Sequence, residues 1–462
     1  MKGVSSWSYA PYKPFFFDGG GIYVCRLAPD ETSMHCEWLA GPGPAYELWL
    51  RPEGQGEFAC AARTTVPEAD ITGLEPERDY EFFVCCGEKK SRVRLFRTGR
   101  PVGTVVNYLH PRDDAYAFSG HYLCSPSLLK HPDGYLLSSM DLFAGGAPQN
   151  LTLVFRSDDD GKTWHYLTDL FPCFWGKMFL HRGAVYMLAC STEYGDLLIG
   201  RSEDGGRTFG MPTVLLRGSC KCAVAGVHKN PQPLVEHNGR LYGSLEWGSW
   251  GEHYHAAMVM SADADADLLD ARSWHFTQPV KYDPAWPGVG EGPSTGNIEG
   301  SLVVAPDGRL LNIMRYDMTK CRPSFGRVLA YRVDTDDPDA PLEYDHAIAL
   351  PGNHSKFTIR RDEKTGLYFA IISRILNEAC IGNRNLLSLM VSPDLEAWTL
   401  ACDLIDRRDE DPKTTGFQYV DWMIEGDDLI YLCRTAINQP HNFHDANYQT
   451  FHRLKGFRSL LR

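Results

Sequence analysis

The chain has 462 residues, of which 43% are hydrophobic and 23% are charged, and its formal net charge is −13. A chain of this length and composition can bury at least one full hydrophobic core, as expected of a globular protein. The excess of acidic residues makes nucleic acids and anionic membrane surfaces poor partners, because both are bound mainly through cationic side chains. An anionic small-molecule substrate stays compatible with this charge if a few arginines converge locally.

The N-terminal stretch MKGVSSWSYAPYKPFFFDGGG contains no apolar run of the length that a signal peptide needs. No later run approaches the length of a membrane span, about 18 residues. We therefore expect a cytoplasmic protein without a membrane partner. The cysteines include no CxxC pair at metal-ligand spacing, so the sequence predicts reduced thiols, no bound metal and no cofactor.

Residues 18–99 form short runs that alternate apolar and polar residues and are bounded by Gly, Pro, Asp or Glu. This pattern is typical of the strands of a β-sandwich. The segment GLEPERDYEFFV, residues 73–84, resembles the fibronectin type III module, in which a Leu-x-Pro turn precedes a tyrosine-bearing strand. The resemblance implies a fibronectin type III-like β-sandwich over residues 1–100, which we expect to act as a spacer or packing partner.

From residue 101 the pattern lengthens into six cycles of strands separated by tight turns such as HPDG and HNGR. Such cycles, about 45 to 65 residues long, predict the blades of a β-propeller, because each blade buries its faces only against its neighbours. The sequence therefore predicts an all-β protein with a six-bladed propeller over residues 101–462. The sixth cycle lacks a fourth strand, and GTVVNYL, residues 103–109, has no partner of its own, so we expect the two to pair and close the ring.

Two acidic turns, RSDDDGKTWHYL at residues 156–167 and RSEDGGRTFG at 201–210, share the pattern Ser-x-Asp-x-Gly-x-Thr-aromatic. Glycine can adopt positive φ there, and Ser and Asp side chains can hydrogen-bond to the turn, so we interpret the acids as structural. Degenerate copies occur at 261–276 and 392–398. A calcium loop would need glycine in the sixth place, a distal Glu and flanking helices, which neither DDDG nor ADADAD supplies. The pattern resembles the Asp-box of the sialidase superfamily.

Charged residues end the apolar second strands of several cycles, which would be costly in a core and is natural at the mouth of an axial pocket. Arginines of cycles four to six could hold a carboxylate or sulfate by bidentate hydrogen bonds, and ion pairs between blades are the alternative. From these second strands we predict the following substrate-binding residues: Arg315, Arg374, Arg434, Asp141 and, as an aromatic contact, Trp247.

The first strands carry a second set of polar side chains that should converge on the axis. Lys229 and Lys356 are predicted to bind substrate. A pair of carboxylates, one protonated and one ionised, is the minimum for glycoside hydrolysis, and we favour Glu299 with Asp421 as acid and base partners. The complete set of catalytic candidates is Glu299, Asp421, Glu246, His228, His354, Tyr316 and Tyr419.

The Asp-boxes, the six cycles and the arginines of cycles four to six together resemble the sialidase superfamily. The resemblance implies an exo-acting carbohydrate enzyme with its site at the axis, a tyrosine nucleophile activated by a glutamate, and an aspartate acid. In true sialidases the first blade opens with Phe/Tyr-Arg-Ile-Pro, whose arginine helps to hold the substrate carboxylate. Here the stretch is LCSPSLL, and Cys124 stands at the position of that arginine, which argues against sialic acid as the substrate.

Three functions fit these observations. The first is a sialidase-like glycoside hydrolase that acts on a small anionic oligosaccharide or glycoside. The second is a lyase that cleaves uronic-acid oligosaccharides by β-elimination, with a histidine base, a tyrosine acid and Arg315 neutralising the carboxylate. The third is a glycan-binding propeller without catalysis.

Overall fold

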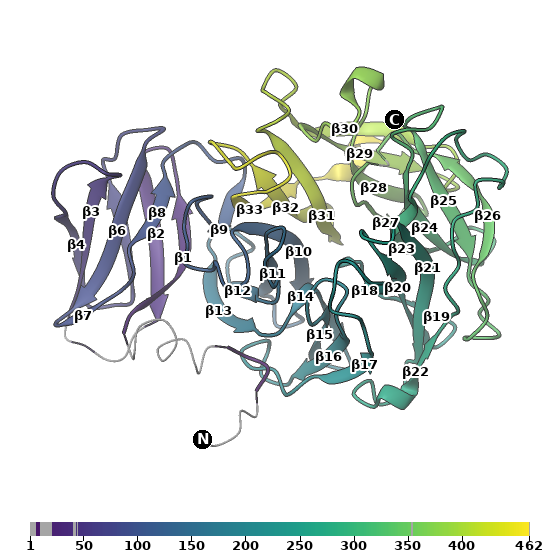
Figure 1. The fold of residues 1–462 in the computed structure, drawn as a ribbon, viewed down its shortest axis with the longest axis horizontal. Coiled ribbons are helices and arrows are strands. Elements are labelled where there is room, and N and C mark those ends of the chain that lie inside the picture. Colours follow the sequence, from purple (N-terminus) through teal and green to yellow (C-terminus); the bar gives the residue numbers. More distant parts are fainter. Residues whose placement is uncertain (1–5, 10–20, 40–42, 44, 353, 462) are drawn as a thin grey trace.

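The computed structural model describes residues 6–9, 21–39, 43, 45–352 and 354–461. A small β-sandwich lies beside a ring of six sheets (Figure 1). The predicted class, an all-β protein with a six-bladed propeller preceded by a sandwich, is therefore confirmed. The described helices are three short 3-10 turns: η2 (Ala271–Ser273), η3 (Glu378–Cys380) and η4 (Phe457–Leu460). No helix of the described residues has the length and apolar character needed to cross a bilayer.

The sandwich consists of two antiparallel sheets that pack face to face around Trp38 and Phe82. The first sheet has the order β1-β2-β5 and contains β1 (Tyr23–Pro29), β2 (Ser33–Leu39) and β5 (Glu68–Thr72). In the second sheet β6 pairs with β3, β7 and β8, and its strands are β3 (Tyr46–Pro52), β4 (Ala59–Thr64), β6 (Asp79–Cys86), β7 (Lys89–Lys90) and β8 (Arg94–Arg97). A relation to fibronectin type III modules stays a prediction from the sequence.

Each blade of the propeller is an antiparallel sheet whose first strand lies nearest the axis. Blade 1 contains β10 (Tyr122–Lys130), β11 (Leu136–Phe143), β12 (Thr152–Ser157) and β13 (His165–Leu170); blade 2 contains β14 (Phe174–His181), β15 (Ala184–Cys190), β16 (Leu197–Ser202) and β17 (Thr213–Leu216); blade 3 contains β18 (Gly226–His228), β19 (Val235–His237), β20 (Arg240–Ser249), β21 (Tyr254–Asp263) and β22 (Trp274–Phe276). Blade 4 contains β23 (Gly296–Val304), β24 (Leu310–Asp317), β25 (Arg327–Arg332) and β26 (Glu343–Ala349); blade 5 contains β27 (Thr358–Arg361), β28 (Tyr368–Ser373), β29 (Leu386–Ser392) and β30 (Thr399–Asp406); blade 6 contains β31 (Gly416–Glu425), β32 (Asp428–Ala436), β33 (Tyr448–Leu454) and β9 (Thr104–Tyr108).

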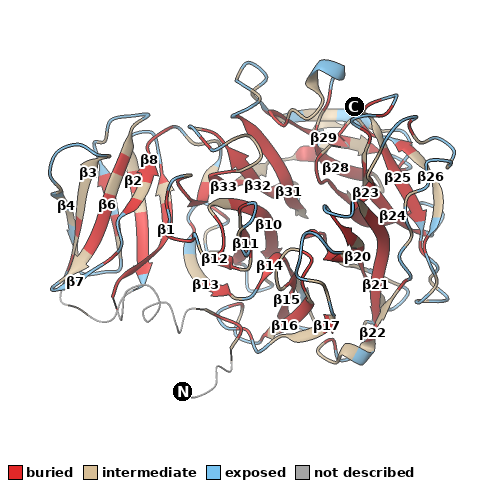
Figure 2. Ribbon diagram, in the orientation of Figure 1, coloured by how far each residue is buried: buried red, intermediate tan, exposed pale blue. Residues whose placement is uncertain are grey.

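The ring closes as predicted, because β9, which precedes blade 1 in the sequence, pairs antiparallel with β33 of blade 6. This pairing removes the exposed edges that an open arc of blades would leave. Buried residues run along the inner strands, whereas most exposed residues lie in the loops and turns (Figure 2).

The two acidic turns use their carboxylates to hold the backbone. Ser157 Oγ accepts a hydrogen bond from the Gly161 amide at 2.8 Å, and Asp159 Oδ1 accepts one from the Thr163 amide at 2.9 Å. Gly161 has a φ of 86°. The second turn, between β16 and β17, makes the equivalent hydrogen bonds at the same spacing. The ring of Trp164 packs between blades 1 and 6, with its centroid 5.5 Å from that of Phe451 on β33, as expected for a structural turn.

A buried ion pair in the sandwich joins it to the seam of the ring. Arg26 on β1 lies 2.9 Å from Glu37 on β2, and it donates hydrogen bonds to the carbonyls of Val105 and Val106 on β9 at 3.1 and 2.7 Å. Glu37 in turn accepts a hydrogen bond from the amide of Tyr166 on β13, at 2.9 Å. Since β9 belongs to blade 6 and β13 to blade 1, the pair clamps the last blade to the first.

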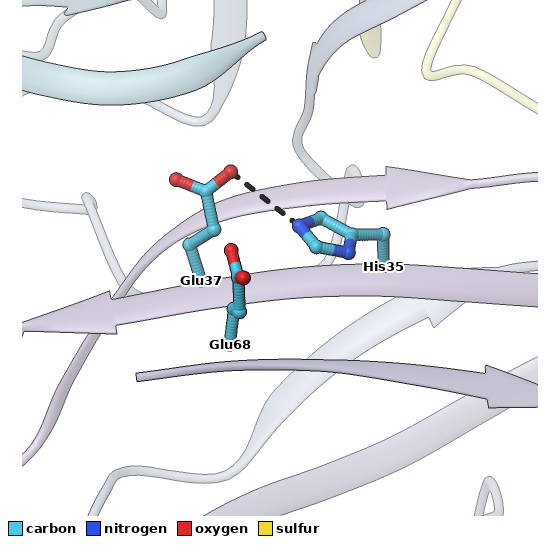
Figure 3. Close-up of side chains that lie close together, drawn as sticks. All are labelled: His35, Glu37 and Glu68. Atoms are coloured by element: carbon cyan, nitrogen blue, oxygen red, sulfur yellow. Dashed lines mark ion pairs between the residues drawn. The ribbon is translucent and has the colours of Figure 1, made fainter. Parts of the chain in front are cut away.

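Glu37 also belongs to a group of three side chains that could in principle hold a metal ion, and no other such group occurs among the described residues. Figure 3 shows its members, His35, Glu37 and Glu68, on two adjacent strands of the sandwich. The carboxylate of Glu37 already accepts hydrogen bonds from Arg26 and Tyr166, so this group is better explained as part of the seam.

Replacement of Glu37 by alanine should destabilise the protein by about 3 kcal/mol, because Arg26 would stay buried without its carboxylate. Urea unfolding followed by tryptophan fluorescence measures this change. The matched variant Glu68→Ala, directly opposite Glu37 in the same sheet, should change the stability by no more than about 0.5 kcal/mol. Equal effects of the two substitutions would contradict the role of the pair as a clamp.

Candidate active site

Three innermost strands contain a β-bulge in which a residue other than glycine has a positive φ. The bulges fall between Phe174 and Lys177, between Ile298 and Gly300, and between Gln418 and Asp421. Within them Trp175, Glu299 and Tyr419 have positive φ values of 51°, 58° and 55°. Positive φ is strained for residues other than glycine, and both strain and bulges concentrate at functional sites, where they re-aim side chains.

Two of these strained residues meet at one arginine. Nη1 of Arg315, on β24, lies 2.8 Å from a carboxylate oxygen of Glu299 and 3.4 Å from the hydroxyl of Tyr419. Glu299 also accepts a hydrogen bond from Tyr419. Burial opposes ionisation of Glu299, but Arg315 and the hydrogen bonds outweigh it and lower the pKa of this carboxyl. Burial and the charge of Glu299 raise the pKa of Tyr419, so the pair consists of an ionised carboxylate and a protonated phenol.

Two further arginines lie near the Tyr419 ring. The guanidinium carbons of Arg384 and Arg434 lie 5.8 and 5.0 Å from the ring centre. Arg434, on β32, donates to Cys124 Sγ at 3.4 Å and to the carbonyl of His444 at 2.5 Å. A guanidinium from blade 6 thus reaches Cys124 on the first strand of blade 1.

Arg384 and Arg434 form no ion pair with a carboxylate among the described residues. Among the described residues, Arg384 and Arg434 hydrogen-bond only neutral groups, and the Nε atom of each is buried without a hydrogen-bond partner. Burial, together with the nearby charges of Arg315 and Arg434, lowers the pKa of Arg384 to about 10. Buried cations of this kind are stabilised when an anion binds, and paired arginines suit a carboxylate or sulfate.

A histidine and a carboxylate lie on the blade 3 side of the same site. Nδ1 of His228 is 2.6 Å from Oε2 of Glu246, and the amide of Gly300 donates to Oε1 of Glu246 at 3.2 Å. The bulge at Glu299 releases this amide from the strand ladder, so Glu246 satisfies it. The ring of Trp175 packs against His228, with the centroids 4.3 Å apart.

Asp421 lies two residues beyond Tyr419 but in a different environment. Its side chain is 0% exposed, forms an ion pair with Lys177 and accepts the amide of Leu128 at 2.7 Å. Burial opposes ionisation, yet Lys177, Lys356 and Arg360 keep the pKa of Asp421 low. This environment disagrees with the predicted role as acid or base partner of Glu299, because the carboxylate is ionised, buried and already paired.

The two predicted substrate-binding lysines are also buried, and they hold backbone carbonyls. Nζ of Lys229 donates to the carbonyl of Trp175 at 2.6 Å, and Nζ of Lys356 donates to that of Val420 at 3.0 Å. Asp141 accepts the Thr152 hydroxyl at 2.5 Å, and burial raises the pKa of this carboxyl to about 7. Asp141 also accepts a hydrogen bond from the amide of Gly176 at 3.3 Å, so all three residues bind backbone groups of the bulged strands.

Three other predicted site residues lie outside the cluster, and the alternation of side chains along a strand explains each of them. Tyr316 follows Arg315 directly, and its hydroxyl bonds to that of Tyr282, at 2.8 Å. Trp247 follows Glu246 and packs into the core beside blade 2. Arg374, one residue beyond β28, points to the outer strand and pairs with Asp403 at 2.7 Å.

Arg384 takes the place that the sequence had assigned to Arg374. It lies in the loop between β28 and β29, where no strand register could have predicted it. His354 is near by, since its carbonyl accepts a hydrogen bond from Arg384 at 3.0 Å and its Nε2 bonds to the Ser324 carbonyl at 3.1 Å. The structure thus brings together Glu299, Tyr419, Arg315, Arg434, His228, Glu246 and His354 from the predicted set.

The chain matches no family model, and no curated protein matches its sequence. Several solved structures share its fold at low identity. An α-L-arabinanase of Penicillium chrysogenum complexed with arabinobiose has a TM-score of 0.53 and 13% identity, over 78% of this chain and 99% of that chain. An α-L-arabinofuranosidase of Fusarium graminearum has a TM-score of 0.54 and 14% identity over the same shares. A leech intramolecular trans-sialidase complexed with 2,7-anhydro-Neu5Ac has a TM-score of 0.51 and 10% identity, over 96% of this chain and 92% of that chain.

The raised pKa of Asp141 predicts how the stability depends on pH. The folded protein keeps a proton on Asp141 up to about pH 7, whereas the unfolded chain releases it near pH 4, so this group makes stability fall as pH rises between these values. The fall is at most about 1.4 kcal/mol per pH unit. Asp141→Asn should therefore be more stable relative to the wild type at about pH 8 than at about pH 5 in urea unfolding. Asp421→Asn is the matched control and should be destabilised at about pH 8, since its paired carboxylate is ionised there.

Proposed function

We propose that this protein is an exo-acting glycoside hydrolase for an anionic glycan, with Tyr419 as the nucleophile and Glu299 as the base. The observation that carries the proposal is the buried contact of Tyr419, Glu299 and Arg315 at the axis. An ionised Glu299 can take the phenolic proton as the tyrosine oxygen attacks the anomeric carbon. The covalent intermediate is then released by water, as in a retaining glycosidase.

The proteins of similar fold support a carbohydrate as the substrate class. Their structures hold arabinobiose in the arabinanase and 2,7-anhydro-Neu5Ac in the trans-sialidase. The turns at Asp159 and Asp204 fit the Asp-boxes of such propellers. These turns and the axial tyrosine–glutamate pair favour the sialidase-like branch of this fold.

The arginines favour an anionic group on the sugar. Arg315 is neutralised by Glu299, whereas Arg384 and Arg434 lack a carboxylate partner among the described residues. A carboxylate or sulfate bound beside Arg384 and Arg434 would supply the negative charge that these two guanidinium groups lack. Oxidised sugars such as uronic acids fit as well as sialic acid does.

Tyr419→Phe should lower kcat/KM by at least about 1,000-fold, because it removes the attacking oxygen. Glu299→Gln should lower it by about 100- to 10,000-fold, because it removes the base. The measurement is release of fluorescent 4-methylumbelliferone from glycosides of N-acetylneuraminic acid, D-glucuronic acid and L-arabinofuranose. Tyr316→Phe is the matched control, since its hydroxyl bonds to Tyr282 away from this cluster, and it should keep its activity.

Two outcomes would contradict this proposal in different ways. An unsaturated product from uronic-acid oligosaccharides, detected by its ultraviolet absorbance, would indicate the lyase, for which His228, Tyr419 and Arg315 could supply base, acid and neutralising charge. Glycan binding by the wild type without turnover of any substrate would indicate a binding propeller.

The Arg434→Met and Arg384→Met variants should lose kcat/KM for the anionic glycosides by about 10- to 100-fold, which corresponds to one or two charged hydrogen bonds. They should also lose the rise in Tm that N-acetylneuraminate or glucuronate gives the wild type. Arg374→Met is the matched control, because Arg374 pairs with Asp403 on the outer strand. An equal loss for the neutral arabinofuranoside would show that the arginines do not select for charge.

A further inference from the structure

We propose that His228, oriented by Glu246, is the acid that protonates the departing group of the glycan and the base that then activates water. The assignment rests on the function proposed above, in which Tyr419 and Glu299 form the covalent intermediate. Glu299 receives the proton of Tyr419, so another group has to give a proton to the departing oxygen.

The geometry of the dyad suits proton exchange at one atom. His228 on β18 and Glu246 on β20 lie directly opposite each other in blade 3, and both side chains are buried. The carboxylate of Glu246 forms a hydrogen bond with Nδ1 of His228 at 2.6 Å, which fixes the orientation of the imidazole ring. Nε2 is then the nitrogen that can give or take a proton. No hydrogen bond within the described ranges of the chain occupies Nε2 of His228.

The same carboxylate connects the dyad to the nucleophilic pair. Oε1 of Glu246 accepts the amide of Gly300, which the bulge at Glu299 frees from the ladder. His228 is one of the neighbours that lower the pKa of Glu299 against its burial, after Arg315 and Tyr419. His228 therefore lies within electrostatic range of the reacting carboxylate, on the side away from Arg384 and Arg434.

The other histidines near the site are engaged elsewhere. Nε2 of His255 is 3.0 Å from the hydroxyl of Tyr194, and burial lowers the pKa of His255 to about 2. Nε2 of His354 bonds to a backbone carbonyl. Burial and the charge of Arg434 lower the pKa of His444 to about 4.

Glu193, in the loop between β15 and β16, is the strongest rival. Its Oε2 accepts hydrogen bonds from Gln149 Nε2 at 2.9 Å and Cys222 Sγ at 3.0 Å, and its Oε1 accepts one from Trp250 Nε1 at 3.1 Å. Because both oxygens already act as acceptors, this carboxylate is arranged to hold the loops and not to donate a proton.

Aromatic side chains beside His228 provide a place for the departing sugar. Trp175 packs on His228, and Trp250, which is 48% exposed, lies 6.4 Å from it between ring centres. Exposed tryptophans offer flat apolar surfaces that suit the apolar face of a sugar. The anionic group would then lie at blades 5 and 6, and the departing sugar at blades 2 and 3.

The reaction then proceeds through two successive displacements at the anomeric carbon. The oxygen of Tyr419 bonds to the anomeric carbon and passes its proton to Glu299, while the bond to the departing oxygen breaks with its electron pair and that oxygen takes the proton of His228 Nε2. Water next bonds to the anomeric carbon and gives a proton to His228 Nε2. The bond to Tyr419 breaks with its electron pair, and Tyr419 recovers its proton from Glu299.

The experiment compares two glycosides of one sugar that differ in their need for an acid: the 4-nitrophenyl and methyl glycosides of N-acetylneuraminic acid, and the same pair for D-glucuronic acid. His228→Gln should lose about 100- to 10,000-fold of kcat on the methyl glycoside. On the 4-nitrophenyl glycoside it should release one equivalent of nitrophenol in a burst, because nitrophenolate leaves unprotonated, and then turn over slowly. Azide, which attacks without a base, should speed up this slow step.

Glu246→Gln should show the same dependence on the leaving group in weaker form, as a positioning residue would. His255→Gln, a buried histidine next to His228, should affect both glycosides equally, and thermal melting checks that each variant is folded. The assignment would be wrong if His228→Gln lost the same factor of kcat on both glycosides, or if Glu193→Gln showed the loss that depends on the leaving group. Either outcome would leave the proposed function in place. Absence of turnover by the wild type on all four glycosides would overturn the proposed function and this assignment with it.

Discussion

The buried pair of Arg26 and Glu37 reinforces the seam at which the ring closes through the pairing of β9 with β33. A propeller closes at one seam, where the last blade meets the first; here β9, which pairs with β33 in blade 6, leads through residues 109–121 into β10 of blade 1. Here Arg26 binds two carbonyls of β9 in blade 6, and Glu37 binds an amide of β13 in blade 1. The sandwich therefore does more than precede the propeller, since it supplies the charges that fix the seam. The cost of burying these two charges is offset because hydrogen bonds satisfy both ions.

Near the axis, charged side chains bind the backbone groups that the bulges release from the strand ladders. The bulges at Trp175, Glu299 and Tyr419 also free backbone groups from the strand ladder, and a buried polar group without a partner is costly. A charged side chain from the same or a neighbouring blade satisfies each of them: Lys229 holds the carbonyl of Trp175, Lys356 that of Val420, and Glu246 the amide of Gly300. The axial charges are thus the support that keeps Glu299 and Tyr419 in strained conformations.

This support explains which parts of the site could be predicted from the sequence. Strand cycles and turn residues are local patterns, so the ring, its closing strand and the structural role of the acidic turns could be predicted. Charged residues at strand ends indicated which ends of the strands lie at the axis. The alternation of side chains decides which of two neighbouring residues faces the axis, so Arg315 joins the site whereas Tyr316, the next residue, does not. Asp421 and Lys229 have the residue types of a catalytic site, and only the contacts identify them as support.

Arg384 could not have been assigned in this way, whereas Arg434 was predicted from its place on a second strand but without its contact across the seam. Arg384 comes from a loop, and Arg434 crosses the seam to Cys124, whose small thiol leaves room for a guanidinium from the other blade. A substrate anion experiences the charges at a point in space and not the blade that carries them. A cysteine at position 124 therefore does not by itself argue against an anion site near the axis, because Arg434 brings a positive charge from blade 6 to blade 1. A protein that closed its ring with blade 1 displaced by an ångström would keep every residue of this site and lose its geometry.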